Sequence, residues 1–212
     1  MGGNDQQVVN FLPEFVKEWC TTTKTRFVPV GKGDGEKTTG PEDVLHWLYG
    51  LFHSPEYRRR YRSALSQRFP IVLLSANLEM VRALARLGAE LTALHSLESQ
   101  KLEAPITKLI GNRNPVIEKP SWSRGTVWVD KGQTTGFRGV HESVWNFHIG
   151  GYQVCEKWLK DRKGRTLSED DIAHYQKIVV ALSETIRLMA EIDRVIDEHG
   201  GWPGAFQTTA EA

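Results

Sequence analysis

The sequence predicts an α+β fold: a mainly helical globular domain with a small β-sheet or hairpin at about residues 113–139 and a long C-terminal helix at about residues 169–198. Three observations lead to this prediction. Apolar residues recur at helical spacing before and after the middle of the chain. In the middle, Pro, Gly and β-branched residues dominate. The 212 residues, 40% of them hydrophobic, suffice for one sizeable buried core.

The chain before the β-rich segment is expected to form helices joined by turns. An opening helix is predicted at residues 6–20, although Pro13 lies inside this range and proline disfavours the interior of a helix. Ile71–Leu74 is predicted to be a short buried strand or extended segment, and Ser75 after it is a plausible helix N-cap. The spacing of apolar residues predicts further helices over residues 42–52, 55–67 and 75–97.

The β-rich segment combines a predicted hairpin with an excess of positive charge. Gly125–Val129 indicates a strand, Asp130–Gly132 a tight turn, and Thr134–Arg138 the returning strand. Residues 101–140 carry seven Lys and Arg against three Asp and Glu, although the whole chain has a formal net charge of only +1. Such a stretch marks either an anion-binding face or a solvated loop.

After residue 140 the pattern is helical again. Short helices are predicted at 141–147 and 152–159, separated by Gly150-Gly151. Ser168 with Asp171 resembles a capping box and is expected to start a helix of about 30 residues, or about 45 Å. Gly200-Gly201 is expected to end it.

No motif for catalysis is complete in this sequence. Gly31–Thr38 imitates a phosphate-binding P-loop, but Glu36 stands where a glycine must precede Lys-Thr. The histidines lack metal-ligand spacing, and His148 beside Trp145 is expected to be a core residue. Cys20 and Cys155 lie far apart, which fits a reduced cytoplasmic protein, and no apolar run approaches the length of a membrane helix. The chain by itself is therefore not expected to be an enzyme.

Three stretches carry a family resemblance that covers about residues 40–199. They are Pro41–Arg58, which contains His-Ser-Pro-Glu-Tyr, Val144–Arg165, which contains Gly-Tyr-Gln-Val-Cys-Glu-Lys-Trp-Leu-Lys-Asp-Arg-Lys-Gly-Arg, and Leu167–Arg187. In sequence, order and spacing they resemble the C-terminal target recognition, or specificity, domain of type ISP single-chain restriction-modification enzymes. In the Gly-Tyr-Gln block, Gly151, Tyr152 and Gln153 are expected to be structural, with Tyr152 under the long helix.

The resemblance implies a non-catalytic module that recognises double-stranded DNA for an adenine methyltransferase and nuclease, with a role in phage defence. It implies that S-adenosylmethionine, ATP and magnesium bind to methyltransferase and translocase domains elsewhere, and that this chain itself holds no cofactor. Residues 1–166 would form the recognition domain, 167–199 a helical strut packed on it, and 200–212 a tail. A helical protein-interaction subunit that docks a larger enzyme without touching DNA is the alternative.

The candidate DNA contacts follow from residue type, since cations suit phosphates and guanidinium or amide groups suit base edges. Lys119, Arg124 and Lys131 are expected at phosphates. Gln133 and Arg138 are the better base-edge candidates, and Arg113 belongs to the same stretch. Arg58 and Arg62, which share a helix face in a cluster that includes Arg68, form a second candidate or merely a solvated face.

Overall fold

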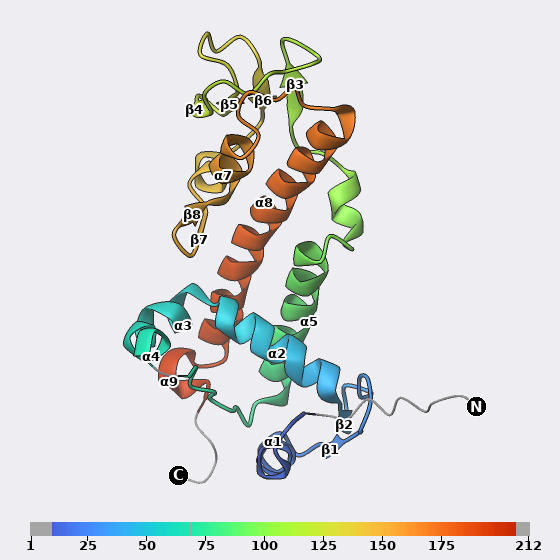
Figure 1. Cartoon of the computed structure of the whole chain (residues 1–212). Coiled ribbons are helices and arrows are strands. Elements are labelled where there is room, and N and C mark those ends of the chain that lie inside the picture. The colour runs from blue at the N-terminus through green and yellow to red at the C-terminus, as the bar shows by residue number, and fades with distance from the viewer. Residues whose placement is uncertain (1–9, 68, 207–212) are drawn as a thin grey trace, which may run out of the picture. The chain divides into compact units, whose positions relative to one another are not determined.

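The computed structural model describes residues 10–67 and 69–206 and confirms the α+β prediction (Figure 1). The helices are α1 (Pro13–Thr23), α2 (Pro41–His53), α3 (Pro55–Arg60), α4 (Arg62–Gln67), α5 (Leu78–His95), the 3-10 turn η1 (Gln100–Glu103), α6 (Glu142–Trp145), α7 (Val154–Lys160), α8 (Glu169–Glu198) and α9 (Gly201–Gly204). The strands are β1 (Arg26–Phe27), β2 (Thr38–Thr39), β3 (Lys108–Ile110), β4 (Ser121–Ser123), β5 (Thr126–Trp128), β6 (Gly136–Arg138), β7 (His148–Ile149) and β8 (Tyr152–Gln153).

The chain packs as two compact units. The first extends to Thr92 and resumes at Leu188, and the second comprises Ala93–Arg187. Helices α5 and α8 each contribute residues to both units. The functional division into residues 1–166 and 167–199 stays a prediction.

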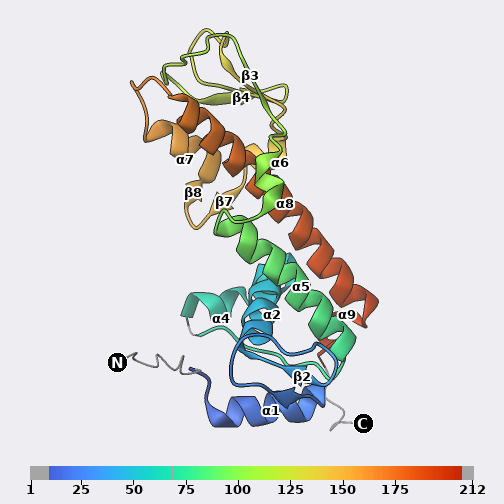
Figure 2. The same cartoon turned by 90° about the vertical axis from the view of Figure 1, so that its right-hand side faces the viewer.

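In the first unit, α2 and α5 cross with their backbones in contact (Figure 2). A Cβ atom on Gly88 of α5 would lie 1.8 Å from the carbonyl oxygen of His46 on α2. A Cβ atom on Gly50 would lie 2.6 Å from the carbonyl oxygen of Leu84. Only glycine permits this approach, so the two positions fix how these helices pack.

The second unit is built on a four-stranded antiparallel sheet in the order β3-β6-β5-β4. One face of the sheet packs on the core of the unit, where the ring of Phe137 lies 4.6 Å from that of Tyr175 on α8. The hairpin of β5 and β6 is the one that the sequence predicts, while β3 lies outside the predicted range. On the other face, Lys108 and Arg138 are exposed, whereas Thr126 between them and β4 is buried.

The long helix is confirmed, together with its start and end. Ser168 Oγ accepts a hydrogen bond from the amide of Asp171 at 3.1 Å, and Asp171 Oδ2 accepts one from the amide of Ser168 at 3.2 Å. This reciprocal arrangement is a capping box, in which the shorter Asp serves in place of Glu. Helix α8 ends at Glu198, before Gly200, whose φ is 111°.

Several local predictions are wrong. The opening helix starts at Pro13, because proline suits a first helical turn, and residues 6–9 lie outside the described residues. The helix predicted from Pro55 to Gln67 breaks at Tyr61. Of the two alternatives for Ile71–Leu74, the strand is wrong, and in this irregular segment Leu74 is buried while Ile71 and Val72 are exposed. Asn77, rather than Ser75, caps α5, since its Oδ1 accepts the amide of Met80 at 3.1 Å.

Candidate nucleic-acid interface

The outward face of the four-stranded sheet is polar and basic. Residues paired across antiparallel strands point to the same face, and neighbours along a strand point to opposite faces. The register pairs Lys108 with Arg138, Arg138 with Thr126, and Thr126 with Ser123. These residues therefore form one row across the sheet, opposite the core-facing row of Leu109, Phe137, Val127 and Trp122.

A depression of about 570 Å³ lies on this outward face. Its lining residues are Ser123, Arg124, Thr126, Trp128, Gln133 and Arg138. The indole N–H of Trp128 donates to Ser123 Oγ at 2.8 Å, which holds the ring in place. The structure thus brings together three of the predicted contact residues, Arg124, Gln133 and Arg138, around one aromatic side chain.

Two of these residues adopt a left-handed backbone conformation. Arg124, in the tight turn between β4 and β5, has a φ of 48°, and Gln133, in the turn between β5 and β6, has a φ of 53°. Glycine or asparagine adopts this conformation at lower cost, and the strain of another residue is on the order of 1 kcal/mol or more. Both residues with this backbone strain have side chains that line the same depression. Backbone strain gathered in one place is typical of a functional surface.

The turn between β5 and β6 is held by Asp130. Its Oδ1 accepts the amide of Thr135 at 2.9 Å, and its Oδ2 accepts the amide and the hydroxyl of Thr134 at 3.1 and 2.8 Å. Burial acts to raise the pKa of Asp130, but the hydrogen bonds from Thr135 and Thr134 outweigh it and hold the pKa below the usual value. The ionised carboxylate therefore stabilises the turn that carries Gln133.

We expect Asp130→Asn to lower the free energy of unfolding by about 1–3 kcal/mol near neutral pH, because charge-assisted hydrogen bonds to two amides are weakened. A carboxyl whose folded-state pKa is depressed stabilises the fold above its unfolded-state pKa of about 3.9, and this stability is lost as the pH falls through the folded-state value. Urea denaturation should therefore show a difference in the free energy of unfolding between wild type and variant, and this difference should become smaller at acidic pH. The exposed Asp170→Asn is the matched control, and an equal effect there would contradict this role.

The remaining predicted residues of this stretch adjoin the same turn. The amide of Lys119 donates to the carbonyl oxygen of Val129 at 3.2 Å, and the amide of Lys131 donates to Glu118 Oε2 at 3.0 Å. The amide of Asn112, next to Arg113, donates to Thr135 Oγ1 at 3.2 Å. Arg113, Lys119 and Lys131 are all exposed.

Six cations of the second unit lie on this sheet and its turns. Among the described residues, no acidic side chain forms an ion pair with Lys108, Arg113, Lys119, Arg124, Lys131 or Arg138. On the helices, by contrast, cations are paired, as in Lys101–Glu184 at 2.9 Å and Lys177–Glu103 at 2.6 Å. An excess of unneutralised cations is what a polyanion requires.

Lys108 is the contact candidate that the sequence analysis missed. Strand β3 has three residues and pairs with β6 across a long separation in sequence, so its position could not be inferred locally. Lys108 is followed by the partly buried Leu109. If a strand is assumed here, this alternation of polar and apolar residues predicts that the lysine side chain points away from the core.

Arg58 and Arg62 belong to the first unit, where they line a groove of about 680 Å³. Arg59 and Arg60 are neutralised by Glu56, each at 2.7 Å, whereas no ion pair of Arg58 or Arg62 is found within the described part of the chain. Arg68 lies outside the described residues. The role of Arg58 and Arg62 as a second basic surface stays a prediction.

The Gly-Tyr-Gln block forms a hairpin instead of a helix. Strands β7 and β8 pair around Gly150 and Gly151, and Tyr152 is 64% exposed instead of packing under the long helix. His148 is also exposed, with its Nδ1 at 2.6 Å from the carbonyl oxygen of Asn146, so it is not a core histidine. The two glycines form the turn of this hairpin, so the structural role expected of Gly151 is confirmed.

No group of three or more potential metal-ligating side chains occurs among residues 10–67 and 69–206. Within these same residues, no helix has the length and apolar character to cross a membrane.

One family model matches nearly the whole chain. The profile of a family described as the Type ISP C-terminal specificity domain matches residues 2–191. No sequence among the curated proteins matches the chain. The fold is similar to that of a nuclease-deletion mutant of the Type ISP restriction-modification enzyme LlaGI in complex with a DNA substrate mimic, with a TM-score of 0.53 and 17% sequence identity over 71% of this chain and 16% of that chain.

Two further solved structures share the fold. They are the ATP-dependent Type ISP restriction-modification enzyme LlaBIII bound to DNA, with a TM-score of 0.50 and 20% identity, and a DrdV–DNA complex, with a TM-score of 0.52 and 19% identity. The matches cover 79% and 87% of this chain but only 11% and 19% of those chains. The chain thus spans a small part of the length of the proteins it resembles.

Proposed function

The chain belongs to the Type ISP C-terminal specificity domain family, and from this premise we propose that it recognises a double-stranded DNA sequence for a restriction-modification enzyme without catalysing a reaction itself. The observation that carries the proposal is the outward face of the sheet in the second unit. There, cations without acidic partners surround a depression lined by Arg124, Gln133 and Arg138. The similar enzymes LlaGI, LlaBIII and DrdV were solved with DNA or a DNA mimic, which supports the same conclusion.

The proposed contacts divide into two kinds. Lys119, Arg124 and Lys131 neutralise phosphates, because they lie on exposed turns next to the depression. Gln133 and Arg138 reach base edges, since guanidinium groups pair bidentately with guanine and amides with adenine. Arg113, exposed beside the same turn, adds to the phosphate-facing charge.

The remaining steps of restriction and modification are assigned to other parts of the enzyme. Adenine methylation would use S-adenosylmethionine, and cleavage and translocation would use ATP and magnesium, all bound by methyltransferase, nuclease and translocase domains. Residues 167–199 would act as a strut towards those domains. The proposed site of action is the cytoplasm.

Selection from a library of randomised DNA duplexes tests this function. The chain is expected to enrich a defined sequence, because base-edge contacts discriminate between base pairs by about 1–3 kcal/mol each. Arg138→Ala carried through the same selection is the control, and it should enrich a sequence that is degenerate at one position. Binding without enrichment of any sequence would contradict a specificity function. Failure to bind DNA at all would favour a helical protein-interaction subunit.

A further inference from the structure

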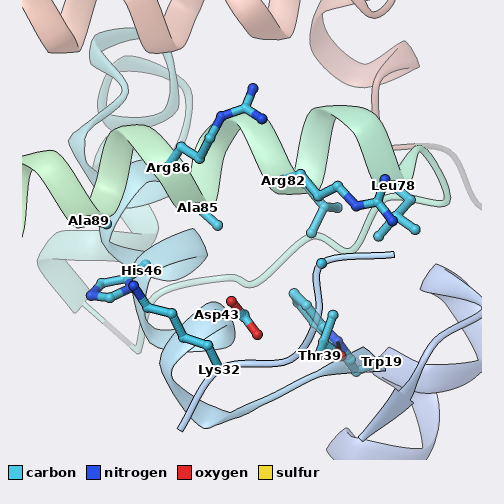
Figure 3. A pocket seen from close by; sticks show the side chains of 12 residues that line it. Trp19, Lys32, Thr39, Asp43, His46, Leu78, Arg82, Ala85, Arg86 and Ala89 are labelled. Atoms are coloured by element: carbon cyan, nitrogen blue, oxygen red, sulfur yellow. Dashed lines mark hydrogen bonds between the residues drawn. The ribbon is translucent and has the colours of Figure 1, made fainter. Parts of the chain in front are cut away.

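Polar side chains around a hollow can hold one ligand only where they converge. In the first unit, a cavity of about 300 Å³ is lined by residues of α2, α5 and the loop that follows β1 (Figure 3). The guanidinium of Arg82 and the ammonium group of Lys32 point to opposite ends of this cavity, so they offer no common site. In the depression on the sheet of the second unit, by contrast, polar side chains surround a single aromatic ring, that of Trp128.

The ring of Trp128 belongs to the outward face of the sheet. Trp128 lies two residues after Thr126 in β5, so the two side chains point to the same face. Its cross-strand neighbours are Ser121 on β4 and Gly136 on β6. Neither neighbour places a large side chain against the ring, which is only partly buried. Trp122 on β4 packs against the core instead, so a role in the core does not account for Trp128.

The orientation of this ring is fixed, and its only hydrogen-bond donor is already used. The indole N–H donates to Ser123 Oγ at 2.8 Å, and an indole has no other hydrogen-bonding group. Trp128 therefore has only apolar surface to offer a ligand. The other side chains that line the depression are polar or charged: Ser123, Arg124, Thr126, Gln133 and Arg138. The ring is thus the one large apolar group in a lining that otherwise suits hydrogen bonds.

Duplex DNA offers one group that fits an apolar surface among base-reading residues. Stacked bases present only their edges in the grooves, and in the major groove these edges carry donors, acceptors and, on thymine alone, a methyl group. An aromatic ring that lines a depression does not project as a wedge between base pairs would. The thymine methyl group, however, projects into the major groove and can enter the depression.

We propose that Trp128 is a specificity-determining residue that packs against the methyl group of a thymine in the major groove. The inference rests on the proposed function, because it requires that the outward face of the sheet reads base edges. Arg138 lies two residues after Gly136, the neighbour of Trp128, which is a separation of about 7 Å along β6. Successive base pairs are about 3.4 Å apart. The thymine is therefore expected within about two base pairs of the one that Arg138 contacts.

Replacing single thymines of the selected duplex by deoxyuridine, which removes only the methyl group, tests the proposal with the intact chain. We expect the affinity of wild type to fall about fourfold at one position, the effect of burying about one methyl group. In Trp128→Ala, duplexes with thymine and with deoxyuridine at this position should bind equally. Competition measured by fluorescence anisotropy gives these ratios. Equal binding of both duplexes by wild type at every position, or a selected sequence without an A·T pair, would overturn the proposal.

A purely structural role of Trp128 predicts a different pattern. Trp128→Ala would then weaken binding of both duplexes by the same factor and keep the fourfold preference for thymine, which would overturn the methyl contact. If Trp128→Ala does not fold, Ser123→Ala provides a milder variant that removes only the hydrogen bond to the ring. It should reduce the preference to about twofold or less, because a mobile ring must be ordered on binding. An unchanged preference in Ser123→Ala would contradict the proposal.

Ser121→Ala is the matched control, because Ser121 is also on β4 but is not one of the residues that line the depression. It should keep the wild-type preference for thymine. The role of Trp128 can fail without the DNA-binding function. A chain that selects a sequence but binds thymine and deoxyuridine equally retains DNA recognition and refutes only the role of Trp128. A chain that selects no sequence refutes the proposed function and, with it, the methyl contact.

Discussion

Replacing Arg124, Lys131 and Arg138 together by alanine is expected to reduce duplex DNA affinity by about 100-fold or more and to flatten its dependence on salt. These residues lie on or beside one sheet face, and none of them has an acidic partner among the described residues. Each lost phosphate contact should reduce the salt slope by about one, because fewer counterions are released on binding. Fluorescence anisotropy of a labelled duplex at several salt concentrations measures both quantities.

The matched control for this variant removes the same charge from the helices of the same unit. Lys101, Lys177 and Arg187 are each paired with a glutamate, Glu184 or Glu103. Their combined replacement by alanine changes the net charge as much as the sheet variant does. The affinity for duplex DNA should nevertheless stay within about threefold of wild type, because surface ion pairs contribute little to the stability of the fold. Equal loss in both variants would mean that total charge, and not the sheet face, determines binding.

Arg138→Ala alone is expected to remove discrimination at one base pair of the recognised sequence, a loss of about 5- to 150-fold in preference for the correct base. Arg138 pairs with both Lys108 and Thr126 in the sheet register, which places it in the middle of the outward row. Lys131→Ala should instead weaken binding to all sequences by a similar factor, because a phosphate contact carries no base information.

Competition between the selected duplex and its single-base variants separates these two effects. A uniform loss of affinity in Arg138→Ala would reassign this residue to the phosphates. A loss of preference at one base pair in Lys131→Ala would reassign that lysine to a base edge.

The elements that the sequence predicts correctly are those with local signals. The long helix has a capping box at Ser168 and two glycines at its end, and the hairpin of β5 and β6 has a turn signal at Asp130–Gly132. These signals depend only on residues a few positions apart in the sequence. The local structure that they favour is therefore the same whatever the tertiary contacts are. The opening helix is wrong at its start because Pro13 opens the helix rather than interrupting it.

The candidate interface was predictable only in part. Residue type and charge identify Arg124, Gln133 and Arg138 as candidates, and in the fold all three line one depression. Lys108 was missed because β3 pairs with β6 at a sequence separation that no local pattern specifies. The exposure of Tyr152 was missed for a related reason, since whether an aromatic side chain is buried depends on the element it belongs to.

The most direct measurement of the central claim is the affinity of the intact chain for a labelled random-sequence duplex at about 50 and 200 mM salt. A domain that contacts several phosphates through the basic sheet face should bind at the lower salt concentration and lose orders of magnitude of affinity at the higher one. Absence of binding at the lower salt concentration, or an affinity that does not change with salt, would contradict the assignment of this face to DNA.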